Sequence, residues 1–473
     1  MRTNRALVLP VAVLLALGLA PAAASGAAPA AAKARPAPGA TGGGDPYFPR
    51  QGNGGYDVSS YRLAVGYTPQ TKRLTGTAVI SARATQSLSR FSLDLRRNLT
   101  VTSVRVDGRA ARFAQPAALV QELVITPRHA LRDRHRFEVR VTYAGTAAPV
   151  TDPDGSLDGF IPTDDGAFVA SEPQGSPTWF PVNDTPRDKA TYRISVTVPQ
   201  GLVAVSNGDL LGHRTRAGKT TWDYRLDRPV SSYLITAGIG RFTLTTGRTP
   251  LGVPYLIAVD PREAAKAAPV LAKLPAALDW LTRTYGRYPF GQSGAIVDHA
   301  PNVGYALETA TRPVFDRAPD LSTLVHELAH QWYGDDVTLS QWRDIWLNEG
   351  FAEFSSWYYD ETHGGDSTAT HLADLLAKPA SDTDEWNPPP GNPGSGAGIF
   401  AGSVYDRGAG TLAALRQKVG DRTFFTIMRG WLRQHPYGNA TVGQFTAYAE
   451  RVARRDLTPF FRTWLYQPGK PGA

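Results

Sequence analysis

The sequence predicts a multidomain α and β protein, with an N-terminal antiparallel β domain followed by a mainly helical domain. Short alternating apolar runs separated by Gly, Pro and Asp occupy residues 47–242, whereas apolar residues recur at helical spacing after about Pro250. The chain has 473 residues, more than one ordinary domain holds. We therefore expect at least two folded parts of different secondary structure.

The N-terminal residues have the order of a secretory signal peptide. Arg2 and Arg5 precede an apolar run from Ala6 to Ala20, and small residues follow. The run is short of the ~20 residues that a membrane-spanning helix needs. We expect residues 1–25 to be removed on export, so that the mature protein is secreted without stable membrane insertion. Residues 26–45, rich in Ala, Pro and Gly, are expected to be a flexible leader.

Composition excludes several classes of site. The chain has no cysteine, so it has no disulfide, thiolate metal site or cysteine nucleophile. Any metal must be held by His, Asp or Glu. The net charge of +8 is spread thinly along the chain, and we therefore expect no nucleic-acid binding.

Residues 46–245 are expected to form the β domain. Alternating runs begin at Tyr61, Phe137 and Tyr192, and they are rich in Val, Thr and Tyr. These runs alone would also suit a plain β-sandwich binding module.

Residues 246–473 are expected to form the second, mainly helical domain. The helices are predicted at Ala264–Tyr285, Leu321–Tyr333, Leu347–Thr362 and Gly408–Gln434. The segment from Lys378 to Gly402 is rich in Pro and Gly and is predicted to be a long loop, which is more often functional than idle in a compact domain.

The strongest local signal is the segment from His326 to His330. Residues four apart on a helix share one face, so His326 and His330 can reach one ion. Glu327 follows the first histidine and is suited to take a proton from a metal-bound water. The alternative is a pair of histidines on a polar helix face.

A catalytic zinc needs a third protein ligand and an open position. Glu349, on the next predicted helix, is a candidate for that ligand. Glu353 lies one turn later. The interpretation of Glu353 as a solvated or supporting carboxylate is as well founded as a direct role at the metal. The histidines outside the motif, at positions 299, 363 and 371, are taken as structural.

His326–Glu327–x–x–His330 followed by Asn348–Glu349–Gly350 resembles the zinc signature of the family M1 metallopeptidases, the relatives of aminopeptidase N and leukotriene epoxide hydrolase. The resemblance covers most of the chain and suggests a short, secreted, two-domain bacterial form. It implies a saddle-like β domain followed by a thermolysin-like zinc peptidase domain. It also implies one Zn²⁺ per chain, held by the two histidines and Glu349, with Glu327 as the base.

The resemblance further implies residues that recognise the substrate. Glu308, in Gly304-Tyr305-Ala306-Leu307-Glu308-Thr309, matches a glutamate that binds the substrate's α-ammonium, and Gly304, Tyr305 and Ala306 would line the cleft along the substrate backbone. Glu172 matches a second amine anchor in the β domain. Tyr405 matches an oxyanion donor. The segment departs from the family's Gly-Ala-Met-Glu-Asn at Tyr305, Leu307 and Thr309.

Together these features predict a zinc metallo-aminopeptidase acting on peptides with a free N-terminus. The alternatives are a zinc endopeptidase with an open cleft, and an inactive secreted β-domain binding or scaffold protein. Because the chain ends soon after Trp464, without the helical C-terminal domain of longer relatives, we expect a rather open cleft. The sequence does not reveal the oligomeric state or the preferred first residue.

Overall fold

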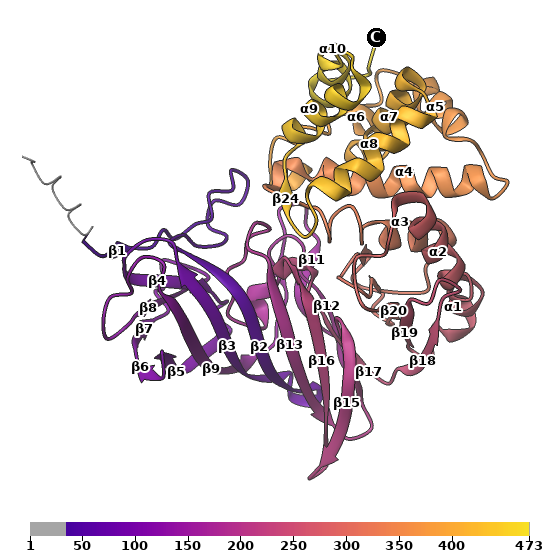
Figure 1. Ribbon diagram of the computed structural model, residues 1–473. Coiled ribbons are helices and arrows are strands. Elements are labelled where there is room, and N and C mark those ends of the chain that lie inside the picture. The colour runs from indigo at the N-terminus through magenta and orange to yellow at the C-terminus, as the bar shows by residue number, and fades with distance from the viewer. Residues whose placement is uncertain (1–34, 473) are drawn as a thin grey trace, which may run out of the picture. The chain divides into compact units, whose positions relative to one another are not determined.

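The structure is a computed structural model that describes residues 35–472, and the chain from Pro36 onward forms one compact unit. The predicted signal peptide and residues 26–34 lie outside the described residues. In Figure 1 the indigo-to-magenta half of the chain forms β-sheets, and the orange-to-yellow part forms helices. None of the described helices combines the length and apolar character that a membrane crossing requires.

The largest sheet of the N-terminal domain has eight strands in the order β15-β16-β13-β2-β3-β9-β5-β6. The strands are β2 (Tyr56–Thr68), β3 (Arg73–Ala84), β5 (Leu99–Val106), β6 (Arg109–Ala110), β9 (Arg136–Thr146), β13 (Ala190–Pro199), β15 (Asp209–Arg216) and β16 (Lys219–Val230). Along β2, Tyr61, Leu63 and Val65 are buried while Arg62 and Ala64 are exposed, the alternation of a sheet with one buried face. The sheet is antiparallel except that β13 pairs with β2 in parallel, because a long crossover separates these two strands.

Two smaller sheets pack against this large one. The first contains β1 (Ala37–Pro38), β4 (Leu88–Asp94), β7 (Arg112–Ala114) and β8 (Glu122–Thr126); the second contains β10 (Val150–Thr151), β11 (Leu157–Pro162), β12 (Ala167–Ala170), β14 (Val203–Ser206) and β17 (Ala237–Gly240). Aromatic contacts join the layers. Tyr56 on β2 meets Phe91 on β4 at 5.7 Å, and Tyr67 on β2 meets Phe160 on β11 at 4.8 Å between ring centroids.

The expectation of a flexible leader through residue 45 is wrong for its described C-terminal part. β1 pairs in parallel with β4, and the Gly39 N–H donates to the Arg90 carbonyl at 2.9 Å. The buried Asp45 carboxylate accepts a hydrogen bond from the Trp342 N–H at 2.8 Å. Backbone pairing and one buried acid therefore hold this segment, although its composition lacks large apolar side chains.

The second domain begins with a five-stranded sheet that the helical spacing did not predict. It contains β18 (Thr243–Arg248), β19 (Pro254–Val259), β20 (Ser293–Val297), β22 (Val314–Phe315) and β21 (Ala306–Leu307), in that spatial order. The predicted helix over 264–285 is two helices, α1 (Ala264–Leu271) and α2 (Leu274–Tyr285). Pro275, in the first turn of α2, suits a helix start because it has no N–H to pair.

The remaining helices complete the second domain, and α3 carries the zinc motif. They are α3 (Leu321–Ala329), α4 (Trp346–Thr362), α5 (Thr368–Ala377), α6 (Thr383–Trp386), α7 (Gly402–Val419), α8 (Asp421–Gln434), α9 (Val442–Ala453) and α10 (Thr458–Phe461), with the short strands β23 (Thr338–Leu339) and β24 (Asn439–Ala440) between them. Gly420, with φ of 81°, divides the predicted helix over 408–434 into α7 and α8. Between Lys378 and Gly402, α6 and one short 3₁₀ turn are the regular structure.

Helices α4 and α7 approach each other closely where both carry glycine. A Cβ on Gly350 would lie 2.5 Å from the Trp346 ring and 3.1 Å from the backbone of Gly408. Glycine at position 350 therefore permits a separation that any larger residue would prevent. This approach brings Tyr405, one turn before Gly408, toward the ligands on α4.

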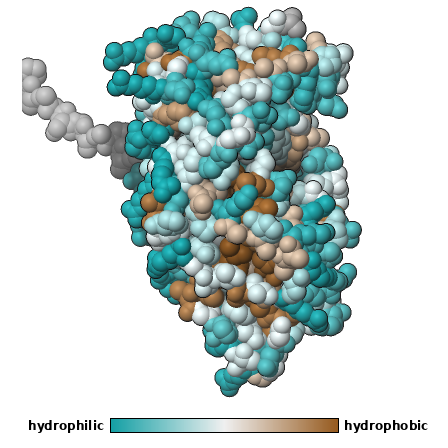
Figure 2. Space-filling model, turned by 90° about the vertical axis from the view of Figure 1, so that its right-hand side faces the viewer, coloured by the Kyte–Doolittle hydropathy of each residue, from teal (hydrophilic) through white to brown (hydrophobic). Residues whose placement is uncertain are grey.

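Polar contacts also join the two domains. Lys189, directly before β13, is half-buried, and its Nζ donates to the carbonyls of Asp335 and Asp336 at 3.0 and 2.9 Å. Large apolar side chains that are exposed are scattered over both domains. On the face drawn in Figure 2, hydrophilic residues surround smaller apolar areas, as is usual for folded proteins.

Candidate active site

Helix α3 carries both histidines of the motif and the glutamate between them. Asp320 caps its N-terminus by accepting a hydrogen bond from the Thr323 N–H at 2.8 Å. His326 lies in the last turn and His330 at the C-cap, so the four-residue spacing places both imidazoles on one face. Both histidines are buried.

Helix α4 supplies the third side chain of this centre. One oxygen of Glu349, Oε2, lies 3.3 Å from Nε2 of His326 and 3.4 Å from Nε2 of His330. In a tetrahedral site with zinc–nitrogen bonds of ~2.0–2.1 Å, neighbouring ligand atoms are about 3.3 Å apart. The spacing and the chemistry of these three donors therefore fit Zn²⁺, with one position left for water or substrate.

Glu353, whose role the sequence left open, contacts the first histidine. Its Oε2 lies 3.0 Å from Nδ1 of His326, and its Oε1 accepts a hydrogen bond from Trp357 at 2.9 Å. Nδ1 of His330 donates to the Tyr333 carbonyl at 3.1 Å. These contacts place the proton of each imidazole on Nδ1 and leave Nε2 free to bind metal. Glu353 is thus a supporting carboxylate.

The charges of the centre are set by burial and by close partners. Burial alone would raise the pKa of Glu349, but the imidazoles of His330 and His326 lower it to about 2. Burial raises the pKa of Glu327 to about 7, against the opposing effect of the two histidines. One oxygen of Glu327 is buried and has no hydrogen-bond partner among the described residues, so it is free to receive a proton.

Tyr405, near the start of α7, stacks on the first histidine. The two ring centroids are 5.9 Å apart with 25° between the planes. Burial, reinforced by the nearby carboxylates of Glu349 and Glu172, holds the pKa of the phenol well above its usual range. The hydroxyl therefore keeps its proton and can donate to an oxyanion.

Two more glutamates face the centre from opposite domains. Glu172 follows β12 in the β domain, and Glu308 follows β21. One carboxylate oxygen from each of Glu172, Glu308 and Glu349 lies within 4.8 Å of the other two. Both amine-binding candidates are buried, and each has an oxygen without a hydrogen-bond partner in the described part of the chain. Burial raises the pKa of both carboxyls.

A cavity of about 370 Å³ joins these groups. Every site residue predicted from the sequence lines it, including Gly304, Tyr305 and Ala306. The sequence did not identify five further lining residues, namely Asp154, Ser156, Val303, Leu307 and Phe400. Phe400 comes from the long Pro/Gly loop, so part of that loop reaches the cavity. Leu307 lies in the segment around Glu308, and no motif marks the other four positions.

The segment from Gly304 to Thr309, which departs from the family's pattern, is held by hydrogen bonds to its neighbours. The Tyr305 hydroxyl donates to the Leu157 carbonyl at 2.6 Å, which ties this segment to the β domain. Gly304, with φ of 92°, donates its N–H to Asp316 at 2.8 Å. Thr309 bonds within its own turn, to the carbonyl of Arg312. The change at position 305 therefore anchors the cavity wall and leaves Glu308 in place.

Arg407 is a supporting residue whose importance the sequence did not reveal. It is buried, and its guanidinium donates to five backbone carbonyls. The acceptors are Trp386, Thr463, Trp464, Gln467 and Gly469, at 2.6–3.0 Å. This network fixes the start of α7, two residues after Tyr405.

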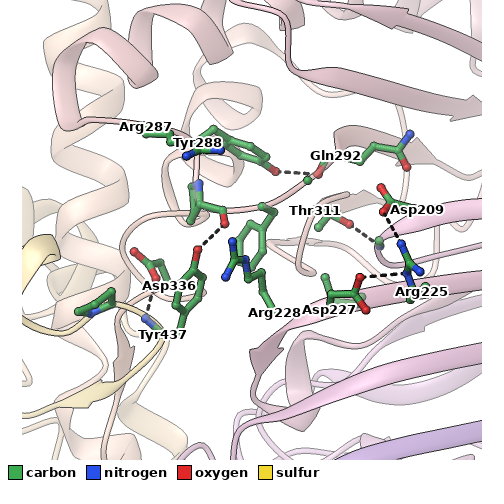
Figure 3. Close-up of a pocket in the computed structure, with 16 residues that line it drawn as sticks. Asp209, Arg225, Asp227, Arg228, Arg287, Tyr288, Gln292, Thr311, Asp336 and Tyr437 are labelled. Carbon is green, nitrogen blue, oxygen red and sulfur yellow. Dashed lines mark hydrogen bonds and ion pairs between the residues drawn. The ribbon is translucent and has the colours of Figure 1, made fainter.

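A larger cavity of about 480 Å³ lies elsewhere at the junction of the domains (Figure 3) and contains none of the predicted site residues. Several of its polar groups are paired with one another. Arg225 lies 3.0 Å from Asp227, and Asp336 accepts a hydrogen bond from the Tyr437 N–H at 2.7 Å. The described residues that line it include no histidine and no converging set of metal ligands, so the catalytic chemistry is assigned to the smaller cavity.

Family comparisons agree with this arrangement. The Peptidase M1 N-terminal domain matches residues 58–234, and the Peptidase family M1 domain matches residues 307–464. The chain belongs to peptidase family M1. The first match contains Glu172, and the second contains Glu308, the three metal ligands and Tyr405. The M1 assignment and the geometry of the His-His-Glu site together identify zinc as the metal.

Solved structures of this family extend the similarity to most of the chain. The M1 zinc metallopeptidase from Deinococcus radiodurans is 29% identical, with a TM-score of 0.83 over 90% of this chain and 97% of that one. A mutant of that enzyme bound to a Tyr-Ser-Ala substrate has 29% identity and a TM-score of 0.82, over 89% and 96% of the two chains.

Curated M1 relatives are longer. Aminopeptidase M1-B of Oryza sativa subsp. japonica is 27% identical over 327 residues, covering 62% of this chain and 36% of the relative. The chain spans about a third of the length of this relative.

Proposed function

We propose that the protein is a zinc-dependent aminopeptidase that hydrolyses the first peptide bond of peptides with a free N-terminus. The position of Glu172 and Glu308 is the observation that carries this proposal. One oxygen of each lies within 4.8 Å of a Glu349 oxygen, and each carboxylate has a buried oxygen without a hydrogen-bond partner among the described residues. A substrate ammonium would pair with them, and its first peptide bond would then lie beside the metal centre.

His326, His330 and Glu349 would hold the metal. When bound, zinc supplies a Lewis acid that polarises the substrate carbonyl and lowers the pKa of water. Glu327 takes the proton of the attacking water and passes it to the leaving amine. Tyr405 donates a hydrogen bond to the developing oxyanion. Glu353 and the Tyr333 carbonyl hold the two imidazoles in the required tautomer.

An endopeptidase is the second reading of the same zinc centre. An extended substrate backbone in the cleft carries no charge, so it would leave Glu172 and Glu308 buried without a partner, at a cost in binding free energy. A scaffold protein would have no need for the unpaired oxygen of Glu327. Both readings therefore explain less of the cavity than an aminopeptidase does.

We also propose that the enzyme acts outside the cell. The order of basic, apolar and small residues over positions 1–25 supports export through a signal peptide. The N-terminal sequence of protein recovered from the medium of the producing cell would test this. An N-terminus at Met1 in all of the recovered protein would count against it.

The activity is tested with two forms of one short peptide, one with a free amine and one N-acetylated, each with and without a zinc chelator. Mass spectrometry identifies the products. We expect single residues to be released from the free peptide alone, and the chelator to abolish this release. Equal internal cleavage of both forms would favour the endopeptidase. A purified protein without zinc or peptidase activity would favour the scaffold.

A further inference from the structure

Three acidic side chains gather at one edge of the five-stranded sheet, away from the zinc centre. Strands β19 and β20 are parallel neighbours with Val259 opposite Val297. Asp260 and Asp298 directly follow these two residues, so they leave the sheet at the same edge. Asp165 reaches them from the turn between β11 and β12 of the other domain. We call these residues the Asp165–Asp260–Asp298 cluster.

The cluster contains a buried carboxylate without a partner. One oxygen from each of the three residues lies within 4.8 Å of the others. Asp298 is 0% exposed, and its Oδ2 has no hydrogen-bond partner among the described residues. Burial raises the pKa of Asp298 well above its usual range, and Asp165 and Asp260 add to the rise. Burying such a group is costly unless a cation or a proton joins it.

One guanidinium lies beside the cluster and pairs with two of its three members. Arg262 pairs with both oxygens of Asp260, at 2.7 and 2.9 Å, and with Asp164. It is 3.6 Å from Asp165. Within the described residues, no ion pair joins it to Asp298. A single positive charge therefore faces four carboxylates, and the most deeply buried of them receives none of its hydrogen bonds.

We propose that the Asp165–Asp260–Asp298 cluster is a structural site for a hard divalent cation of the calcium type. Carboxylate oxygens are the ligands that Ca²⁺ prefers, at about 2.3–2.6 Å. Two oxygens on opposite sides of such an ion are about 4.8 Å apart, so the cluster can surround one ion. Asp165 is partly exposed and also lines a surface cavity of about 280 Å³.

A cation at this site would join the two domains. It would hold the β11–β12 turn against the edge of the sheet whose last strand, β21, precedes Glu308. The site would stabilise the fold and would leave the zinc chemistry to the residues described above.

The test titrates CaCl₂ into zinc-loaded full-length protein that has been freed of calcium, with zinc kept constant. Calorimetry should give one Ca²⁺ per chain in addition to zinc, and saturating Ca²⁺ should raise the melting temperature by about 2 °C or more. MgCl₂ serves as a comparison, since Mg²⁺ demands a tighter octahedral site. Absence of Ca²⁺ binding at millimolar concentrations would overturn the proposal and leave a shared proton as the explanation of Asp298.

Three variants locate the site. Asp298→Asn and Asp165→Asn should each lose the calcium signal, while Asp366→Asn, at an exposed position after α4, should keep it. Asp165 is partly exposed, so its variant keeps the test valid if Asp298→Asn fails to fold. Peptidase activity without Ca²⁺ confirms the fold of each variant. If both cluster variants bound Ca²⁺ with the affinity of the wild type, the ion would lie elsewhere, and this result would also overturn the proposal.

Discussion

The metal centre, with Glu349 and Glu353, and the proposed amine pocket, formed by Glu172 and Glu308, are neighbouring groups of buried carboxylates with opposite surroundings. In the metal centre, Glu349 faces two imidazoles at 3.3 and 3.4 Å, and Glu353 has partners on both oxygens. In the amine pocket, Glu172 and Glu308 each keep a buried oxygen without a partner among the described residues. The pKa of Glu349 is lowered to about 2, whereas the pKa values of Glu172 and Glu308 are raised.

This difference separates carboxylates whose partners lie within the protein from carboxylates that keep an oxygen for the substrate. Partners within the protein orient the metal ligands before the ion arrives. The proposed amine pocket holds carboxylates whose cost of burial is relieved by a proton or by an incoming cation. Stability and recognition therefore make opposite demands on side chains of the same type a few ångströms apart.

The largest expected effect comes from the base. Glu327→Gln keeps the size of the side chain but cannot accept a proton from water, so kcat should fall by about 10²- to 10⁴-fold. Zinc content, measured by metal analysis, should stay at one per chain because Glu327 is not a ligand. Turnover equal to that of the wild type would mean that another group is the base.

The amine pocket is tested by Glu308→Gln and Glu172→Gln. Each variant loses a charged partner for the substrate ammonium, so kcat/KM for a free peptide should fall about 10- to 100-fold. The N-acetylated peptide should stay uncleaved, and the decisive readout is the fall in kcat/KM for the free peptide at unchanged zinc content. An unchanged kcat/KM would remove these carboxylates from amine recognition.

The supporting contact in the metal centre is tested by Glu353→Gln. Loss of the charged partner of His326 should weaken zinc affinity about 10-fold, measured by competition with a chelator. Glu361→Gln, at the far end of the same helix, should bind zinc like the wild type. Equal zinc affinity in all three proteins would show that the contact between Glu353 and His326 does not tune the site.

The smallest expected effect is on stability, and it has opposite signs in the two regions. In zinc-loaded protein without substrate, Glu308→Gln should raise the melting temperature by about 2 °C, because it removes an unpaired buried charge. Glu349→Gln should lower the melting temperature, because it breaks the set of metal ligands. Glu138→Gln, in an exposed ion pair, should change it little. A fall in the melting temperature with Glu308→Gln would contradict the view that this carboxylate is buried without a partner.

Local spacing predicted the two histidines of the metal centre, and the family resemblance implied the third ligand. His326 and His330 share a face of α3 because they are four residues apart, and this relation holds in any helix. The role of Glu353 could not be predicted in this way, because Glu349 and Glu353 lie one turn apart on α4. Only the crossing of α3 and α4 decides which of them faces metal and which supports an imidazole.

The parts of the fold that sequence patterns missed depend on distant partners. Every residue of β20 is buried, so the strand has no alternation, and its two parallel neighbours are far away in sequence. The segment from Pro36 to Asp45 lacks large apolar side chains, yet backbone pairing with β4 and the contact of Asp45 with Trp342 hold it. Composition describes the side chains of a segment, but it does not predict the strand with which the segment pairs.

The position of Glu172 has a consequence during biosynthesis. Glu172 belongs to the domain that leaves the ribosome first, whereas Glu308, Glu327 and the metal ligands belong to the domain that follows. The pocket for a free N-terminus is therefore complete only after the two domains have docked. Under the proposed function, the first domain made alone has one amine anchor and no metal ligand, and the second domain alone has the metal ligands but only one of the two anchors.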